Sequence, residues 1–180
     1  MTKQIIDKFQ EMSDEELKTE FIKYFGEEKW NQEEMLTKLW PTQLALSDYL
    51  GVEPIPVIVE DIEEDSRYYP KEAYIVISSK LIGDEVEALK CLIHEMKHYQ
   101  QYMCIIHNIT MVPQLEEWKK DFEINCAKAT SYEELICLSI EVDAFAFTKY
   151  IMDKWFDIKI YHPEPIYDEI LSRYITKYFC

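Results

Sequence analysis

The stretch ALKCLIHEMKHYQQY, residues 88–102, decides the expected fold, because it is the centre of a long helical pattern and carries two of the chain's four histidines. His94 and His98 are four residues apart, so on a helix they project from the same face about one turn apart. At that separation two imidazole nitrogens can bind one Zn²⁺. The spacing therefore predicts a metal-binding helix. The plainer alternative is a surface helix with two partly exposed histidines.

Glu95 follows His94 directly, which completes the pattern His-Glu-x-x-His. Because it lies one step around the helix, its carboxylate can approach a water on the metal rather than the metal itself. There it would act as the general base of a metal-assisted hydrolysis. Leu92 and Ile93 precede the histidine, so we expect His94 to lie at the edge of a buried face.

The elements around this helix predict a small sheet within a mostly helical chain. The helix itself is expected from Asp84 to about Ile106, with the Asp84 carboxylate suited to its positive end. Two β-branched runs precede it, 56–60 and 72–79, and an acidic turn segment separates them. The predicted fold class is therefore α+β, with a small sheet preceding the metal-binding helix.

Helical patterns account for most of the remaining chain. The expected elements are a helix from the capping box Ser13–Glu16 to Gly26, a helix from Asn31 to Leu50 that Pro41 kinks or divides, a helix over 114–128, a helix from about 131 to 156, a short strand or extended piece over 157–162 and an amphipathic helix over 164–179.

The chain is expected to form one domain, because 180 residues with 48% hydrophobic composition suffice for one full core. Within it we distinguish an N-terminal helical part over 1–51, a catalytic core over 52–160 and a C-terminal helix over 161–180.

Charge and cysteine content restrict the partners and the compartment. The formal net charge of −16 argues against nucleic acid, whose phosphates repel such a surface, and a basic protein or peptide is easier to accommodate. The plainer alternative is a well-solvated surface without such a partner. The five cysteines are odd in number and form no C-x-x-C pair, which is typical of reduced thiols in a cytosolic protein. No signal-peptide pattern and no run of eighteen apolar residues occurs. We therefore expect a cytoplasmic protein without a membrane partner.

A catalytic zinc normally takes three protein ligands, so the two histidines need a third. Six residues past His98, where one class of zinc enzymes has a histidine, this chain has Cys104. His107 would need a sharp turn after the helix, and His162 lies far along the chain beside a proline. A carboxylate in the apolar segment CLSIEVDAFAF, residues 137–147, is the remaining candidate.

Glu141 and Asp143 both lie in this segment, where a buried acid is costly unless it is paired or binds a metal. Glu141 shares a helical stripe with Leu138 and Phe145, whereas Asp143 lies about 200° away around the helix. Only one of the two can therefore be a direct ligand, and we expect it to be Glu141. The alternative is a carboxylate satisfied by a Lys, Arg or Tyr elsewhere.

The combination H-E-x-x-H, followed on a second helix by E-x-D-A-x-A-F, resembles the gluzincin-type metallopeptidases and most of all the ImmA/IrrE-like group. The resemblance covers about residues 74–152, and it implies a zincin-like domain with Zn²⁺ on His94, His98 and Glu141 and with Glu95 as the catalyst. Two departures are the long gap between the motifs and the absence of a Leu-Leu-Met-Pro-like ending. A SprT-like pattern fits less well, because its later His-Gly is missing. The residues that match the ImmA/IrrE-like motifs are His94, Glu95, His98, Glu141, Asp143, Phe145 and Ala146.

The expected function is zinc-dependent hydrolysis of a peptide bond. Tyr102, His107 and Tyr150 are candidate donors to the oxyanion of such a reaction. If strand 72–79 lies at the sheet edge, it can bind an extended peptide by strand addition; the alternative is ordinary pairing within the sheet. The acidic segment 60–65 could select a basic substrate, and its alternative is a solvated loop. Two other classes fit the same motifs: a non-catalytic binding or regulatory protein on this scaffold, and a zinc hydrolase with a non-peptide substrate.

Overall fold

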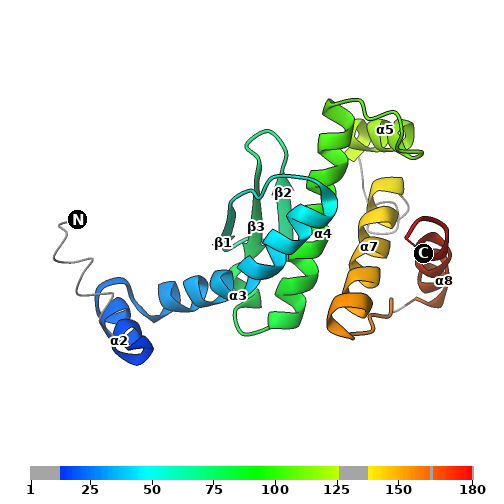
Figure 1. Cartoon of the computed structure of the whole chain (residues 1–180). Helices are drawn as coiled ribbons and strands as arrows, with labels where there is room; N and C mark the ends of the chain where they lie inside the picture. Colours follow the sequence, from blue (N-terminus) through cyan, green and yellow to red (C-terminus); the bar gives the residue numbers. More distant parts are fainter. Residues whose placement is uncertain (1–12, 126–137, 163, 180) are drawn as a thin grey trace.

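The sheet is small, and its strands come from one region of the chain. The computed structural model describes residues 13–125, 138–162 and 164–179, and over these residues the chain is mostly helical with a three-stranded sheet (Figure 1). This confirms the predicted α+β class. The strand order is β1-β3-β2, with β1 parallel and β2 antiparallel to β3. The strands are β1 Val57–Glu60, β2 Ser66–Tyr69 and β3 Tyr74–Ser78.

Strand β2 lies within the segment predicted to be an acidic turn, so the prediction is wrong there. The strand is only four residues long, and Tyr68 is its one buried residue, which leaves almost no alternation to detect. Because β2 pairs with β3, with Tyr68 opposite Ile75, β3 is the central strand and not an edge strand. Ile75, Val76 and Ile77 are fully buried in succession, as is typical of a strand covered on both faces.

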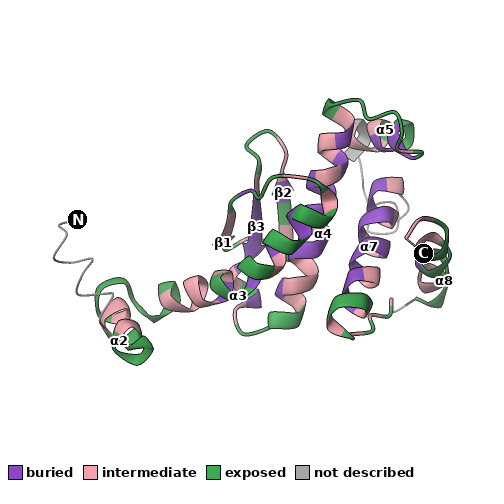
Figure 2. Cartoon of the chain, in the orientation of Figure 1, coloured by how far each residue is buried: buried purple, intermediate pink, exposed green. Residues whose placement is uncertain are grey.

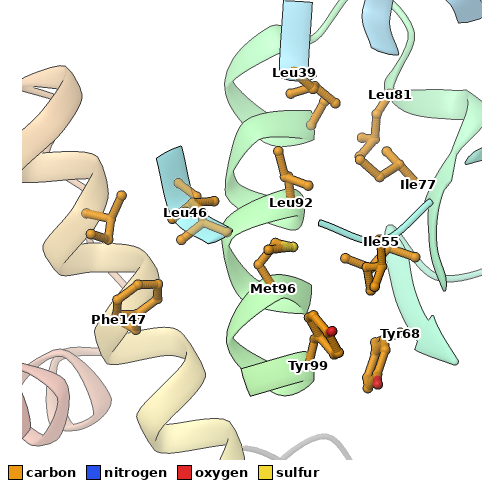
Figure 3. Close-up of a cluster of buried hydrophobic side chains, with 14 of the residues drawn as sticks. Leu39, Leu46, Ile55, Tyr68, Ile77, Leu81, Leu92, Met96, Tyr99 and Phe147 are labelled. Carbon is orange, nitrogen blue, oxygen red and sulfur yellow. The ribbon is translucent and has the colours of Figure 1, made fainter. Parts of the chain in front are cut away.

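Helix α4, Glu85–Ile106, agrees with the predicted helix to within one residue. The Asp84 carboxylate accepts a hydrogen bond from the Glu87 N–H at 3.1 Å and caps the first turn. One face of α4 packs on the sheet, and Figure 3 shows Leu92, Met96 and Tyr99 along it. The opposite face meets α7, so α4 lies between the sheet and the C-terminal helices (Figure 1).

Two helices precede the sheet, α2 (Asp14–Phe25) and α3 (Glu27–Leu50). The predicted capping box of Ser13 and Glu16 is present. Helix α3 begins four residues earlier than predicted, because the Gly26 carbonyl already accepts from the Trp30 N–H at 3.2 Å. Pro41 lies inside α3 and does not divide it.

Three helices follow α4, namely α5 (Leu115–Asn125), α7 (Ser139–Phe156) and α8 (Pro165–Tyr178). The helix predicted over 131–156 is wrong at Leu138, which is extended and is the N-cap of α7. The Asp121 carboxylate of α5 accepts from the Ser139 N–H at 2.6 Å, so it satisfies a free donor at this start. The predicted parts over 126–137 lie outside the described residues.

Of the two alternatives expected over 157–162, a short strand or an extended piece, the strand does not form. Its backbone groups bind the neighbouring helices instead: the Ile160 carbonyl accepts from Lys149 Nζ at 2.6 Å, and the His162 N–H donates to Asp168 at 3.2 Å. The last helix, α8, agrees with its prediction. Figure 2 shows that buried residues concentrate along β3, α4 and α7. Among the described helices, none is both long and apolar enough to cross a membrane.

Candidate metal centre

His94 and His98 face α7 from adjacent turns of α4. Their Nε2 atoms are 3.0 Å apart, and their rings meet edge to face at 4.6 Å between centroids. The side chains are 15% and 11% exposed, so His94 lies at the edge of the buried face as predicted. Phe145 of α7 packs against the His94 ring, with 4.6 Å between centroids.

Glu141 completes the cluster from α7. Its Oε2 atom lies 3.3 Å from His94 Nε2 and 3.4 Å from His98 Nε2. The start of α7, only two residues before Glu141, is fixed by the Asp121 carboxylate. The structure thus brings together the three side chains that the sequence selects as metal ligands. Two of them lie on α4, and the third, Glu141, lies on α7, far along the chain.

The geometry of these three atoms fits a metal ion. In a tetrahedral zinc site with bonds of about 2.0–2.1 Å, ligand atoms are about 3.3–3.4 Å apart. The separations of 3.0, 3.3 and 3.4 Å are close to this value. Two imidazole nitrogens and one carboxylate oxygen are also a donor set that zinc accepts in catalytic sites. His94, His98 and Glu141 can therefore hold a metal ion.

The same contacts perturb the protonation of the ligands. Burial alone would lower the pKa of His98, but the Glu141 carboxylate outweighs it and raises this pKa to about 9. Burial would raise the pKa of Glu141, but the His98 and His94 imidazoles hold it well below its usual range. Without a metal, His98 and Glu141 thus form an ion pair at neutral pH, and a metal that binds here replaces the proton of His98.

Glu95 is buried on α4 beside the cluster. The Ser66 hydroxyl donates a hydrogen bond to Glu95 Oε1 at 2.7 Å. Ser66 is the first residue of β2, so the edge strand of the sheet directly contacts the candidate general base. Cys91, one turn before Glu95, is a free thiol, and burial raises its pKa to about 11.

Gln101 is a residue of the site that sequence reasoning did not identify. Its Oε1 atom lies 2.8 Å from His98 Nδ1, and its side chain is fully buried. Its Nε2 atom lies 2.7 Å from Asp143 Oδ2 and 2.9 Å from the Ile140 carbonyl. A signal existed in the sequence, because a residue three positions after a ligand lies on the same helix face.

Asp143 points away from the cluster, as the helical phase predicts. Its Oδ2 atom lies 3.1 Å from Lys97 Nζ, and both side chains are almost fully buried. The ammonium group of Lys97 also lies 5.2–5.6 Å from the ring centroids of Trp118, Phe147 and Phe179. Asp143 thus forms an ion pair with a lysine, which was the alternative considered for a buried acid, whereas Glu141 faces the histidines.

The other histidine and cysteine candidates for the third ligand lie elsewhere. His107 is the C-cap of α4, nine residues and so about 13 Å along the helix from His98. His162 lies against Tyr167 at the start of α8, and its Nδ1 accepts from the Glu164 N–H at 3.1 Å. Cys104 is buried in a small apolar cluster with Leu115, Trp118 and Ile140.

The three candidate oxyanion donors also differ in their distance from the histidine–glutamate cluster. Tyr150 lies about 13 Å along α7 from Glu141 and packs against Phe179. His107 is equally distant from the cluster along α4. Tyr102 is one turn beyond His98, and its ring contacts Tyr68 and Phe122. Of the three, Tyr102 alone is adjacent to the histidines in helical phase.

The chain also has a cavity of about 360 Å³ between α3 and the start of α4, lined by residues such as Met35, Lys38 and Leu81. None of its lining residues belongs to the histidine–glutamate cluster. The cavity is therefore separate from the three cluster residues.

Comparisons of the chain with models of known protein families, with curated proteins and with solved structures found no match. Function is therefore inferred from the residues of the site.

Proposed function

We propose that this protein is a zinc-dependent metallopeptidase of the H-E-x-x-H type. The observation that carries the proposal is the triangle of His94 Nε2, His98 Nε2 and Glu141 Oε2, whose sides of 3.0–3.4 Å suit a tetrahedral zinc. Glu95 lies beside this triangle on the same helix, which suits a general base. His94, His98 and Glu141 are the proposed zinc ligands.

A zinc ion held by these three residues would lower the pKa of a bound water toward 7 and would polarise a carbonyl group. The work of the chain's own residues is to place and move the proton. With a metal held by His94, His98 and Glu141, Glu95 would take a proton from the attacking water and deliver it to the nitrogen of the leaving amine. The Ser66 hydroxyl, 2.7 Å from Glu95 Oε1, holds the carboxylate in one orientation for both transfers.

The substrate proposed is an extended peptide, bound along β2. In the described part of the chain β2 pairs with β3 alone, so its outer edge has free backbone groups. This edge begins at Ser66, in contact with Glu95. Strand addition is therefore proposed for β2 rather than for β3, which is central. The acidic segment 60–65 leads into β2 and favours basic residues in the peptide.

A cytosolic location is part of the proposal. It is supported by the free thiols of Cys91 and Cys104, because such thiols persist in a reducing compartment.

The test combines metal analysis with cleavage of a peptide library that contains basic and acidic members. We expect one zinc per wild-type chain, and loss of zinc in His98→Ala and Glu141→Ala. Glu95→Gln should keep its zinc but lose cleavage by at least about 100-fold. Glu87→Gln, on an outer turn of the same helix, is the matched control and should cleave normally.

Three outcomes would contradict the proposal. Equal zinc in the wild type and in His98→Ala would remove the metal site. Unchanged cleavage in Glu95→Gln would remove the general base. A wild-type protein that holds zinc but cleaves no member of the library would indicate a zinc-stabilised binding protein.

A further inference from the structure

The orientation of the His98 ring depends on which of its nitrogens carries hydrogen. Nδ1 lies 2.8 Å from Gln101 Oε1, and Nε2 faces His94 and Glu141. Positions of heavy atoms do not by themselves distinguish the two tautomers, nor the two ends of a glutamine amide. The acceptors on the far side of Gln101 do distinguish them.

Those acceptors fix the direction of the Gln101 amide. The Ile140 carbonyl oxygen, 2.9 Å from the amide nitrogen, can only accept hydrogen bonds. The Asp143 carboxylate, 2.7 Å away, is likewise an acceptor while it is ionised. The amide must therefore turn its NH₂ group to these two oxygens and its oxygen to His98. It follows that His98 Nδ1 carries hydrogen, and that the lone pair of the neutral ring is on Nε2.

Asp143 is held where this arrangement needs it. Lys97 Nζ lies 3.1 Å from Asp143 Oδ2, and the side chains are 8% and 2% exposed. Three aromatic rings surround the lysine ammonium, from α5, from α7 and from the residue after α8. A carboxylate with a buried partner of this kind cannot turn toward water, so it keeps accepting from Gln101.

We propose that Gln101 is a positioning residue of the metal centre, which fixes the tautomer and the ring orientation of His98 so that Nε2 faces the metal. This inference rests on the proposed metal site. Gln101 itself touches neither metal nor substrate, and it acts only through His98. Partners of this kind typically change metal affinity on the order of 10–100-fold when they are removed.

The first experiment tests the tautomer without a metal. Long-range ¹H–¹⁵N spectra of histidine-labelled, zinc-free protein are recorded at a pH of about 10, where the His98 ring is neutral. The expected spectrum of the wild type shows hydrogen on Nδ1 of His98, and Gln101→Met should lose this preference. Hydrogen on Nε2 in the wild type would overturn the inference, whether or not the protein binds zinc.

The second experiment measures zinc affinity by competition with a chelator. Gln101→Met should raise Kd on the order of 10–100-fold. Gln100→Met is the matched control, because Gln100 is the neighbouring residue of the same type and contacts Lys97 and Cys104 instead of His98. Equal affinity for zinc in both variants would overturn the role of Gln101 and leave the proposed function intact. Absence of zinc binding in the wild type would instead refute the proposed function.

Discussion

Lys97 and Asp143 form a buried ion pair, and Lys97→Met tests how much the fold depends on it. The methionine keeps most of the side-chain volume but removes the charge. Asp143 then remains 2% exposed and loses its cationic partner. Removal of one member of a buried pair costs about 3–5 kcal/mol, because the other charge stays uncompensated. The lost contacts with three aromatic rings favour the upper half of that range.

The free energy of unfolding is to be measured in urea with a chelator present, so that zinc does not contribute. For a chain of this size a loss of 1 kcal/mol lowers Tm by about 2–4 °C, so a loss of about 4–5 kcal/mol should lower Tm by at least about 8 °C in a parallel thermal unfolding experiment. Lys90→Met is the control on the same helix, because Lys90 pairs with Glu87 at the surface and should cost less than about 1 kcal/mol.

A second substitution separates the charge effect from packing. In Lys97→Met/Asp143→Asn the buried charge is gone, so at least about half of the lost stability should return. If Lys97→Met costs no more than Lys90→Met, the pair does not hold Asp143 in place. If the double variant is less stable than Lys97→Met, the loss comes from packing and not from an uncompensated carboxylate.

Three further predictions concern single residues. The pKa of His98 is raised above its unfolded value to about 9, so its contribution to the stability of the zinc-free protein is complete below about pH 6.5 and is lost as the pH rises through 9. The free energy of unfolding in urea should therefore fall between about pH 7 and pH 10. His98→Gln should diminish this fall. His107→Gln, at the exposed C-cap of α4, is the control and should leave the fall unchanged. Ser66→Ala removes the donor to Glu95 and should lower kcat/KM about 10-fold with zinc content unchanged, whereas Ser172→Ala on α8 should leave both unchanged. Gly51→Ala should cost about 1 kcal/mol in urea unfolding, because Gly51 has φ +68° and no neighbour that a new Cβ would touch, so only backbone strain is added. A free energy of unfolding equal to that of the wild type would contradict this.

Local signals in the sequence predicted α4 and the cluster on it. The cap at Asp84 and an unbroken apolar stripe define the helix, and helical spacing alone places His94 and His98 on one face. The phase difference between Glu141 and Asp143 correctly separated two acids that lie in the same apolar segment. In each case the information lies within a few turns of one helix.

Tertiary contacts supplied what the sequence did not. Strand β2 has only Tyr68 buried, and its pairing with β3 stabilises a segment whose own composition is typical of a turn. The start of α7 depends on Asp121, eighteen residues earlier on another helix. The match of Asp143 with Lys97 also joins two helices. The sequence indicated that a buried acid such as Asp143 needs a partner, but it did not indicate that the partner is Lys97.

Helix α4 has a further consequence for how this chain can vary. From Leu92 to Gln101 every residue except His94 and Gln100 is buried, and the buried side chains face the sheet, α7 and α5 in turn. One residue added or removed between His94 and His98 would rotate His98 by about 100° around the helix axis relative to His94. Every later side chain of the helix would rotate by the same angle and lose its present neighbours. The segment therefore has a fixed length as well as a fixed composition. The ten residues of this helix can therefore change only by substitutions that keep their register.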